Sequence, residues 1–417
     1  MNVQETEQQL GIGFCKRQPL VAERGEGALV WDAAGKKYLD FTSGWGVTCL
    51  GHAHPVMRNA LSEQAAKLWQ NPNSGFAYSP VRAQLLEELQ NWLPAPAMRT
   101  FFVNSGAEAN DAAIKLARKI TGRCGIVSTS GGFHGRTFNT LTVSVNQSSA
   151  EGFLPLLPHN QFVRFGDPGE LEAALGADTA ALIVEPIQGE GGVQIPAADY
   201  LAQARALCKA NSTLLIIDEI QTGFCRTGKP FAMQHENALI EPDFLTMAKG
   251  IAGGFPFAAL AVSADVAKQI NVGDHGGTYC GNPLGCAVAL AVLRYLRAHN
   301  VAASVAEKGK WLGAALTELQ QEFPQLIVQV RGRGLIWALQ LADDDMVQRL
   351  TVASMASGLL VTPTRNGIVR ILPSLLVSDD ELELGVALLR KAFSRASVAV
   401  PSDNNTLDCG ANELQIN

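Results

Sequence analysis

The sequence predicts an α/β protein, with a large domain built on a mostly parallel sheet and a smaller α+β domain after it. Between residues 99 and 263, short apolar runs that read as buried strands alternate with helical segments and Gly-rich loops, as in parallel strands joined by crossovers. From residue 301 onward, helices and strand pairs form a second, shorter run. The chain has 417 residues, 47% of them hydrophobic, which suffices for a large core and two or three domains.

Composition and charge exclude several classes of protein. Lys and Arg number 33 against 39 Asp and Glu, so the net charge is −6 and no basic field favours nucleic acid or an anionic membrane. No apolar run approaches the ~20 residues of a membrane span, and the first residues lack the pattern of a secretory signal. The eight cysteines form no CxxC pair, which indicates reduced thiols. We expect a cytoplasmic protein.

The N-terminal segment is predicted to begin with a hairpin. Residues 27–41 read as an alternating strand, an Ala-Gly turn and a second strand, followed by a Gly-rich loop that holds Trp45, His52 and His54. Two histidines at this spacing can bind a metal, but no cluster of further ligands accompanies them. We therefore expect histidines that structure the loop, and no metal site.

An anion site is predicted at the start of a helix in the large domain. Two amphipathic helices, over 55–69 and 81–93, precede residues 99–120, which read as a strand, a tight turn and a helix. The small residues of the turn SGAE leave free N–H groups at the helix start, where an anion binds. The turn lacks GxxxxGK[ST], so it is not a nucleoside-triphosphate loop. Ser105 and Glu108 also fit an ordinary capping box.

Two further strand regions carry polar loops. Residues 125–145 read as two short strands around a Gly loop with Phe133 and Arg136, where the aromatic ring can stack on a planar cofactor or pack in the core. Residues 179–193 read as a buried strand that ends in a loop with Glu190. A helix over 199–210 and a strand over 257–263 complete the alternation.

The stretch from Leu215 to Gly250 carries the strongest chemical signal. The apolar run LLIIDEIQTGFCRTG contains Asp218 at the end of its strand, and the run FLTMAKG ends on Lys249. A buried lysine is rare, and desolvation lowers its pKa and makes it a nucleophile. A nearby Asp can keep a pyridinium nitrogen protonated, so this pair suits pyridoxal 5'-phosphate (PLP) chemistry. A capping Asp and a surface Lys are the ordinary alternatives.

Four of these polar residues are expected to meet in one site. Ser105, Glu190, Asp218 and Lys249 all lie at or after the carboxyl ends of predicted strands. In an open α/β sheet the ligand binds at that edge.

The C-terminal third reads as a smaller domain. A Gly-rich loop feeds a long apolar helix over 273–300, and helices and strand pairs follow up to residue 396. We expect four parts, namely an N-terminal segment, a large cofactor-binding domain, a small domain and a polar tail, over residues 1–55, 56–300, 301–397 and 398–417.

Six motifs in order, NSGAEAND, GGFHGRT, VEPIQGEGGV, IIDEIQTGFCRTG, MAKGIAGGFP and GGTYCGNPLG, resemble the class III aminotransferases of PLP fold type I. The resemblance covers about residues 20 to 397 and is greatest to the acetylornithine and succinylornithine branch, with ornithine and 4-aminobutyrate aminotransferases as relatives. It implies that part of the N-terminus joins the small domain.

The resemblance also implies roles for the cofactor-binding residues. Lys249 is similar to the lysine that holds PLP as a Schiff base and moves the proton, and Asp218 to the partner of the ring nitrogen. The other expected contacts are Gln221 with the ring hydroxyl, Ser105, Gly106 and Ala107 at the phosphate, Phe133 and Ile220 on the two ring faces, and Thr278 at the phosphate of a partner subunit. The last contact implies a homodimer with its active sites at the subunit interface.

The substrate contacts implied by the resemblance involve four residues. Arg370 is similar to the arginine that holds an α-carboxylate, Glu190 to the gate that pairs with it, and Arg136 to the arginine for the far carboxylate. Trp45 stands where ornithine aminotransferases carry Tyr, and its indole can favour an acylated donor. Cys225 and Cys280 stand where the family often has Gly.

These resemblances imply a transaminase that moves the terminal amine of N-acetylornithine, or a similar ω-amino acid, to 2-oxoglutarate and gives a semialdehyde and glutamate. A 4-aminobutyrate or ω-amine transaminase, a PLP-dependent isomerase or aminomutase, and a PLP-binding protein without enzymatic activity remain as alternatives.

Overall fold

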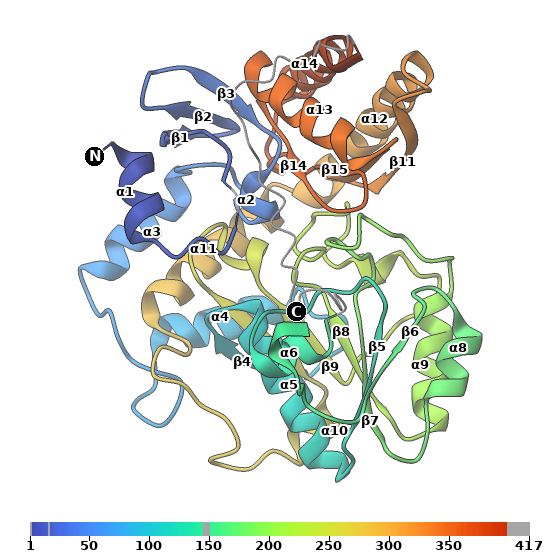
Figure 1. Ribbon diagram of the computed structural model, residues 1–417. Coiled ribbons are helices and arrows are strands. Elements are labelled where there is room, and N and C mark those ends of the chain that lie inside the picture. The colour runs from blue at the N-terminus through green and yellow to red at the C-terminus, as the bar shows by residue number, and fades with distance from the viewer. Residues whose placement is uncertain (1, 16, 145–150, 398–417) are drawn as a thin grey trace.

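The large domain is organised around a seven-stranded sheet in a computed structural model that describes residues 2–15, 17–144 and 151–397 (Figure 1). The strand order is β4-β10-β9-β8-β7-β5-β6. The five strands from β9 to β6 are parallel, and β10 is antiparallel to both of its neighbours. The strands are β4 (Arg99–Val103), β5 (Gly125–Thr129), β6 (Asn160–Val163), β7 (Thr179–Val184), β8 (Leu214–Asp218), β9 (Phe244–Met247) and β10 (Ala258–Val262).

The central strands are apolar throughout because helices cover both faces of the sheet. Leu215 and Ile217 of β8 pack in one buried cluster together with residues of α4, α8 and α9. Ile216, between them, packs in the opposite cluster with residues of α5. The helices of this domain are α3 (Pro55–Ala65), α4 (Pro80–Gln90), α5 (Gly106–Thr121), α6 (Phe138–Thr142), α8 (Pro168–Ala174), α9 (Tyr200–Ala210), α10 (Ala264–Ala267) and α11 (Pro283–Ala298). The parallel α/β prediction is confirmed.

A second, antiparallel sheet forms the smaller domain. Its order is β11-β12-β15-β14, and the strands are β11 (Ile327–Arg333), β12 (Ile336–Leu341), β15 (Ile368–Ile371) and β14 (Thr362–Pro363). Its helices are α12 (Val301–Glu322), α13 (Asp344–Ser357) and α14 (Asp379–Ser397), which lie beside this sheet in Figure 1.

The N-terminal part of the chain joins this smaller domain, as predicted. Strands β1 (Ala22–Glu26), β2 (Leu29–Asp32) and β3 (Lys37–Asp40) form a sheet with β13 (Leu359–Leu360), and β3 pairs with β13 in parallel. The predicted hairpin is the antiparallel pair of β2 and β3. The domain bounds at residues 55, 300 and 397 stay a prediction.

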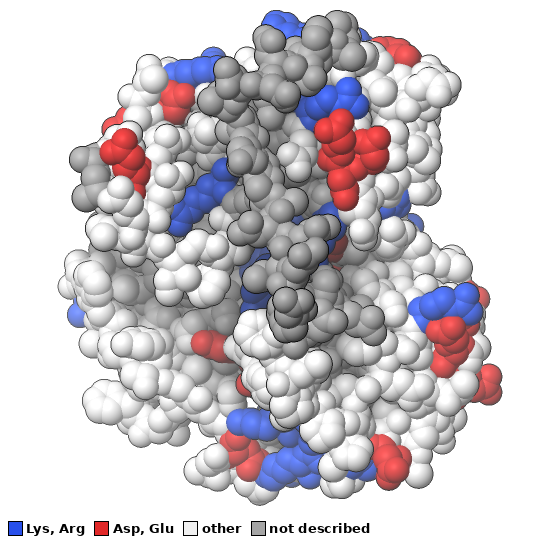
Figure 2. Space-filling model, viewed as in Figure 1, with Lys and Arg blue, Asp and Glu red and all other residues white. Residues whose placement is uncertain are grey.

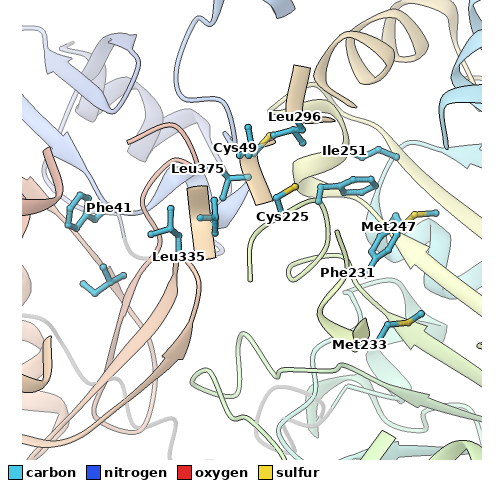
Figure 3. Close-up of a cluster of buried hydrophobic side chains, with 14 of the residues drawn as sticks. Phe41, Cys49, Cys225, Phe231, Met233, Met247, Ile251, Leu296, Leu335 and Leu375 are labelled. Atoms are coloured by element: carbon cyan, nitrogen blue, oxygen red, sulfur yellow. The ribbon is translucent and has the colours of Figure 1, made fainter. Parts of the chain in front are cut away.

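One buried cluster runs across the junction of the two domains. Figure 3 shows Phe41, Leu335 and Leu375 on one side and Cys225 and Met247 on the other, all buried in the same cluster. Apolar side chains packed to crystal-like density resist displacement. The junction therefore fixes the edge of the large sheet relative to the small domain.

Some elements differ from the prediction. The second strand expected within 125–145 is instead helix α6, because Thr142 Oγ1 donates to the Phe138 carbonyl at 2.8 Å and Ser144 Oγ to the Thr140 carbonyl at 2.7 Å, closing helical turns. Val145 lies outside the described residues, as does the tail over 398–417. The short elements α1 (Val3–Leu10), α2 (Ser43–Gly46), β1, β6, α8 and three 3-10 helices over Glu151–Phe153, Ala232–His235 and Lys249–Ala252 had no sequence prediction.

The surface carries no single-signed field on the face that Figure 2 shows, where basic and acidic side chains lie interspersed among uncharged ones. None of the helices in the described part of the chain is long and apolar enough to cross a bilayer. The loop histidines have structural partners, since His52 Nε2 lies 2.9 Å from Asp40 Oδ2 and His54 Nδ1 accepts the N–H of Val56 at the start of α3.

Candidate active site

Asp218 is the last residue of β8 and is held by three hydrogen bonds. It is 3% exposed. Its Oδ2 accepts the Asn110 side-chain amide at 2.8 Å and lies 2.8 Å from His134 Nδ1, while Oδ1 accepts the Ile220 N–H at 3.0 Å. The carboxylate is therefore fixed in orientation at the carboxyl edge of the sheet. Asn110 and His134 had no assigned role in the sequence analysis.

Lys249 follows β9 and lines the same cavity as Asp218. This cavity has a volume of about 390 Å³ and lies at the carboxyl ends of β7, β8 and β9. Lys249 has a positive φ of 43° in a short 3-10 helix rather than in a strand. Burial lowers its pKa to about 8, so roughly a tenth of its amine is neutral at pH 7, far more than for an exposed lysine. The structure brings Lys249 and Asp218 to the same cavity, and their roles there stay a prediction.

The N-terminus of α5 faces the cavity through Ser105, Gly106 and Ala107. The N–H groups of the first helical residues have no intrahelical acceptor, which leaves them for an anion. Ser105 Oγ accepts the Glu108 N–H at 3.2 Å, but the Glu108 carboxylate accepts the N–H of Asn104 instead of that of Ser105. Half of the expected capping box is therefore present.

Glu190 and Arg370 form an ion pair between the two domains. Arg370 lies on β15 of the small domain and is fully buried, and its Nη1 donates to Glu190 Oε1 at 2.6 Å. Nη1 also lies 3.4 Å from Gln221 Oε1, and Nε and Nη2 have no hydrogen-bond partner among the described residues. Burial alone would raise the pKa of Glu190, but the charges of Arg370 and Lys249 outweigh it and hold that pKa below its usual value.

Phe133 and Arg136 line the cavity beside a buried carboxylate. The Arg136 guanidinium lies 5.8 Å from the centre of the Phe133 ring. The N–H of Phe133 donates to Glu185 Oε1 at 2.8 Å. Glu185 directly follows β7, and the sequence analysis gave it no role although it occupies a strand end like that of Asp218.

Of the expected site residues, Arg370, Thr278 and Trp45 do not line the cavity, and Arg370 reaches it through Glu190. Thr278 is exposed, and its carbonyl accepts the side-chain amide of Gln70. Trp45 is 61% exposed, has a left-handed φ of 64°, and contacts the site through its carbonyl, which accepts from Gln221 Nε2 at 3.3 Å. Within a single chain, neither side chain completes the cavity.

A family model described as aminotransferase class III matches residues 15–393. The chain belongs to the class III aminotransferases. The acetylornithine aminotransferase of Xanthomonas axonopodis pv. citri is 43% identical over 383 residues, covering 89% of this chain and 92% of that protein. That of Methanopyrus kandleri is 38% identical over 397 residues, covering 95% of this chain and all of that protein. The ornithine aminotransferase structure from Toxoplasma gondii matches with a TM-score of 0.89 at 32% identity, covering 94% of each chain.

As a member of this family the chain is a PLP-dependent aminotransferase, which confirms the predicted family, fold and cofactor. The cavity fits the group. A lysine amine of lowered pKa and a buried carboxylate line it together, and the free N–H groups at the start of α5 suit a phosphate. A Cβ on Gly106 would lie 2.7 Å from Ile220 Cδ1, so glycine lets the helix start pack close to Ile220 without displacing its side chain.

Proposed function

We propose that this aminotransferase moves the terminal amino group of N-acetylornithine, or of a similar ω-amino acid, to 2-oxoglutarate, giving a semialdehyde and glutamate. The observation that carries the proposal is the buried Arg370, whose Nη1 pairs with Glu190 while Nε and Nη2 remain free among the described residues. Such an arginine can bind an α-carboxylate, and a mobile acid can neutralise it when the donor has none beside its amine. The similarity to acetylornithine aminotransferases supports this donor.

The large-domain residues of the cavity are proposed to hold the cofactor. When bound, PLP supplies an electron sink for the electron pair left when a proton leaves the substrate carbon. Lys249 Nζ would bind the cofactor and would carry that proton, and Asp218 would keep a proton on the ring nitrogen. The further contacts are Gln221 with the ring hydroxyl, Phe133 and Ile220 on the ring faces, and Ser105, Gly106 and Ala107 with the phosphate.

The donor is proposed to lie between two arginines. Arg370 is neutralised by Glu190 when the ω-amine enters and becomes free when the acid moves away from the α-carboxylate of glutamate. Arg136, exposed at the cavity rim, binds the far carboxylate. Trp45 adjoins the site through its carbonyl, which accepts from Gln221, and its indole is proposed to favour an acylated donor chain.

We also propose a homodimer in the cytoplasm. Thr278 lies on an exposed loop that is tied to the segment after α3, since Ser74 Oγ donates to the Gly277 carbonyl at 2.8 Å. From this loop the Thr278 hydroxyl reaches the phosphate of the partner subunit.

The test is to load the purified protein with PLP and screen amine donors for conversion of the cofactor to its amine form, followed by absorbance. N-acetylornithine should be the best of the ω-amines, and 2-oxoglutarate should reverse the change. Borohydride reduction should attach the cofactor to the peptide that contains Lys249. A preference for 4-aminobutyrate, or turnover without any keto acid, would overturn the proposed donor or reaction.

A further inference from the structure

Glu185 is a buried carboxylate that ties two loops of the site together and has no role in the function proposed above. It is 5% exposed and lines the cavity. Its Oε1 accepts the Phe133 N–H at 2.8 Å, and its Oε2 accepts the Gly189 N–H at 3.1 Å. Phe133 belongs to the loop after β5, and Gly189 immediately precedes Glu190. One side chain thus holds the loop with the ring-facing aromatic and the loop with the acid that pairs with Arg370.

The geometry requires a carboxylate at this position. Both oxygens face N–H donors, and only an ionised carboxyl group accepts on both sides without presenting a hydrogen. A glutamine would keep one of the two hydrogen bonds, and its side-chain NH2 group would face the other N–H donor and repel it. An aspartate is one methylene shorter and cannot span both N–H groups.

The Gly189 end of this connection is packed tightly against the rest of the substrate site. A Cβ on Gly189 would lie 1.5 Å from Gln221 Oε1, so the end of the Gln221 side chain packs directly against the loop backbone. Gln221 Oε1 lies 3.4 Å from Arg370 Nη1. A displacement of Gly189 is therefore transmitted to both partners of the Arg370 side chain, Gln221 and Glu190.

We infer that Glu185 is a positioning residue that fixes Phe133 and Glu190 relative to each other, so that one carboxylate couples the holding of the cofactor to the selection between the two substrates. The inference rests on the proposed function for the roles of Phe133 and Glu190.

The surrounding charges give this connection a pH dependence. Burial raises the pKa of Glu185 to about 7, and the negative charge of Asp218 adds to the rise while His134 opposes it. Lys249 also faces Glu185. The charge of Glu190 raises the pKa of this lysine, whereas the charge of Arg370 lowers it. Protonation places a hydrogen between Glu185 and one N–H donor. Both hydrogen bonds are therefore present above about pH 7, and one is lost as the pH falls through that value.

Glu219 provides a matched control for burial. It is fully buried, and burial likewise raises its pKa to about 7. Its carboxylate also accepts two backbone N–H groups, of Ala232 at 3.0 Å and Met233 at 2.7 Å. It follows β8 at the same edge of the sheet, but its two backbone donors lie in the segment after the cavity loops, and the Thr222 hydroxyl also donates to it.

The test compares Glu185→Gln with Glu219→Gln by amide hydrogen exchange, PLP affinity and the two half-reactions. In Glu185→Gln one of the two amides, of Phe133 or Gly189, loses its hydrogen bond and should exchange roughly tenfold faster, the loss expected for one charge-assisted hydrogen bond. The other amide should exchange faster with it, because the two loops are then no longer fixed to each other. PLP should bind about tenfold more weakly, and reactivity with glutamate should rise relative to the ω-amine donor. In wild type, exchange at both amides, corrected for the intrinsic rate, should rise between pH 8 and 6. In Glu185→Gln it should stay flat. Glu219→Gln should behave as wild type at both amides.

Faster exchange at only one of the two amides would overturn the coupling. An equal loss of rate in both half-reactions would show that Glu185 has only a structural role. Glu185→Asp, which keeps the charge and loses the reach, should repeat the effect, and the wild-type pH series decides the matter if both variants unfold. If the proposed donor is wrong, the wild-type protein will not convert N-acetylornithine. The hydrogen-exchange results do not depend on the donor, so the two failures can be told apart.

Discussion

Replacing Glu190 with alanine should make the enzyme favour glutamate over its ω-amine donor. Arg370 is fully buried, and its other partner among the described residues is Gln221 at 3.4 Å. Removing Glu190 leaves a buried guanidinium without a counter-charge. The α-carboxylate of glutamate can then pair with Arg370 without displacing another acid, whereas the ω-amine donor brings no carboxylate to that place.

The size of the effect follows from the burial of the pair. Breaking a fully buried ion pair costs about 3–5 kcal/mol. The Glu190 side chain is 33% exposed, so we expect about 1–3 kcal/mol of lost stability here. If half of this is recovered when glutamate binds, the preference for glutamate rises by roughly two- to tenfold, since about 1.4 kcal/mol corresponds to a factor of ten.

The two half-reactions are followed separately by cofactor absorbance, and stability by thermal unfolding. Glu322→Ala is the stability control, because Glu322 pairs with Arg390 at 2.7 Å where both side chains are 42% exposed, so its loss should change stability much less than the loss of Glu190. An equal change in both half-reactions of Glu190→Ala, or none, would refute the gating role and leave Glu190 as an ordinary loop residue.

Three further predictions concern the cofactor residues. The rate at which apoprotein takes up PLP should rise through about pH 8 as Lys249 becomes neutral, and a rate flat from pH 7 to 9 would contradict its lowered pKa. Asp218→Asn should slow turnover by roughly 100-fold or more while the protein stays folded, because an amide cannot stabilise a pyridinium, and near-normal turnover would make Asp218 structural. Thr278→Ala should weaken PLP binding by roughly tenfold, measured by equilibrium dialysis. A monomer that holds PLP as tightly as the dimer would remove the basis for that contact.

The sequence predicted the part of the site that sits on regular structure. Asp218 follows a run of four apolar residues that is buried on both faces, so the position of its carboxylate at the sheet edge follows from the pattern alone. The turn at Ser105 was predicted in a similar way, because a strand pattern precedes it and a helix pattern follows it. Lys249 was placed at the right edge, although its backbone is a 3-10 turn with positive φ instead of strand.

The supporting residues could not be found in this way because their partners are distant in the sequence. Asn110 and Asp218 are 108 positions apart, and His134 and Asp218 are 84 apart, so no local spacing signals either hydrogen bond. Asn110 lies on the buried face of α5, where an unpaired amide would be costly, and that burial was the available signal. Helix α6 was missed because its Thr residues favour strands by propensity while their hydroxyls bond to the backbone one turn earlier.

The arrangement of the two domains is itself part of the active site. Asp218 and Lys249 come from the large sheet, whereas Arg370 comes from the small one, and Arg370 reaches the site through its contacts with Glu190 and Gln221. Arg226, eight positions after Asp218 in the chain, is buried at this junction. Its Nη1 donates to the Leu335 carbonyl at 3.0 Å and to the carbonyl of Pro373, which lies three residues after Arg370. A change in how the domains pack would therefore move Arg370 relative to Lys249, and the buried cluster at the junction sets the distance between the substrate carboxylate and the reacting amine.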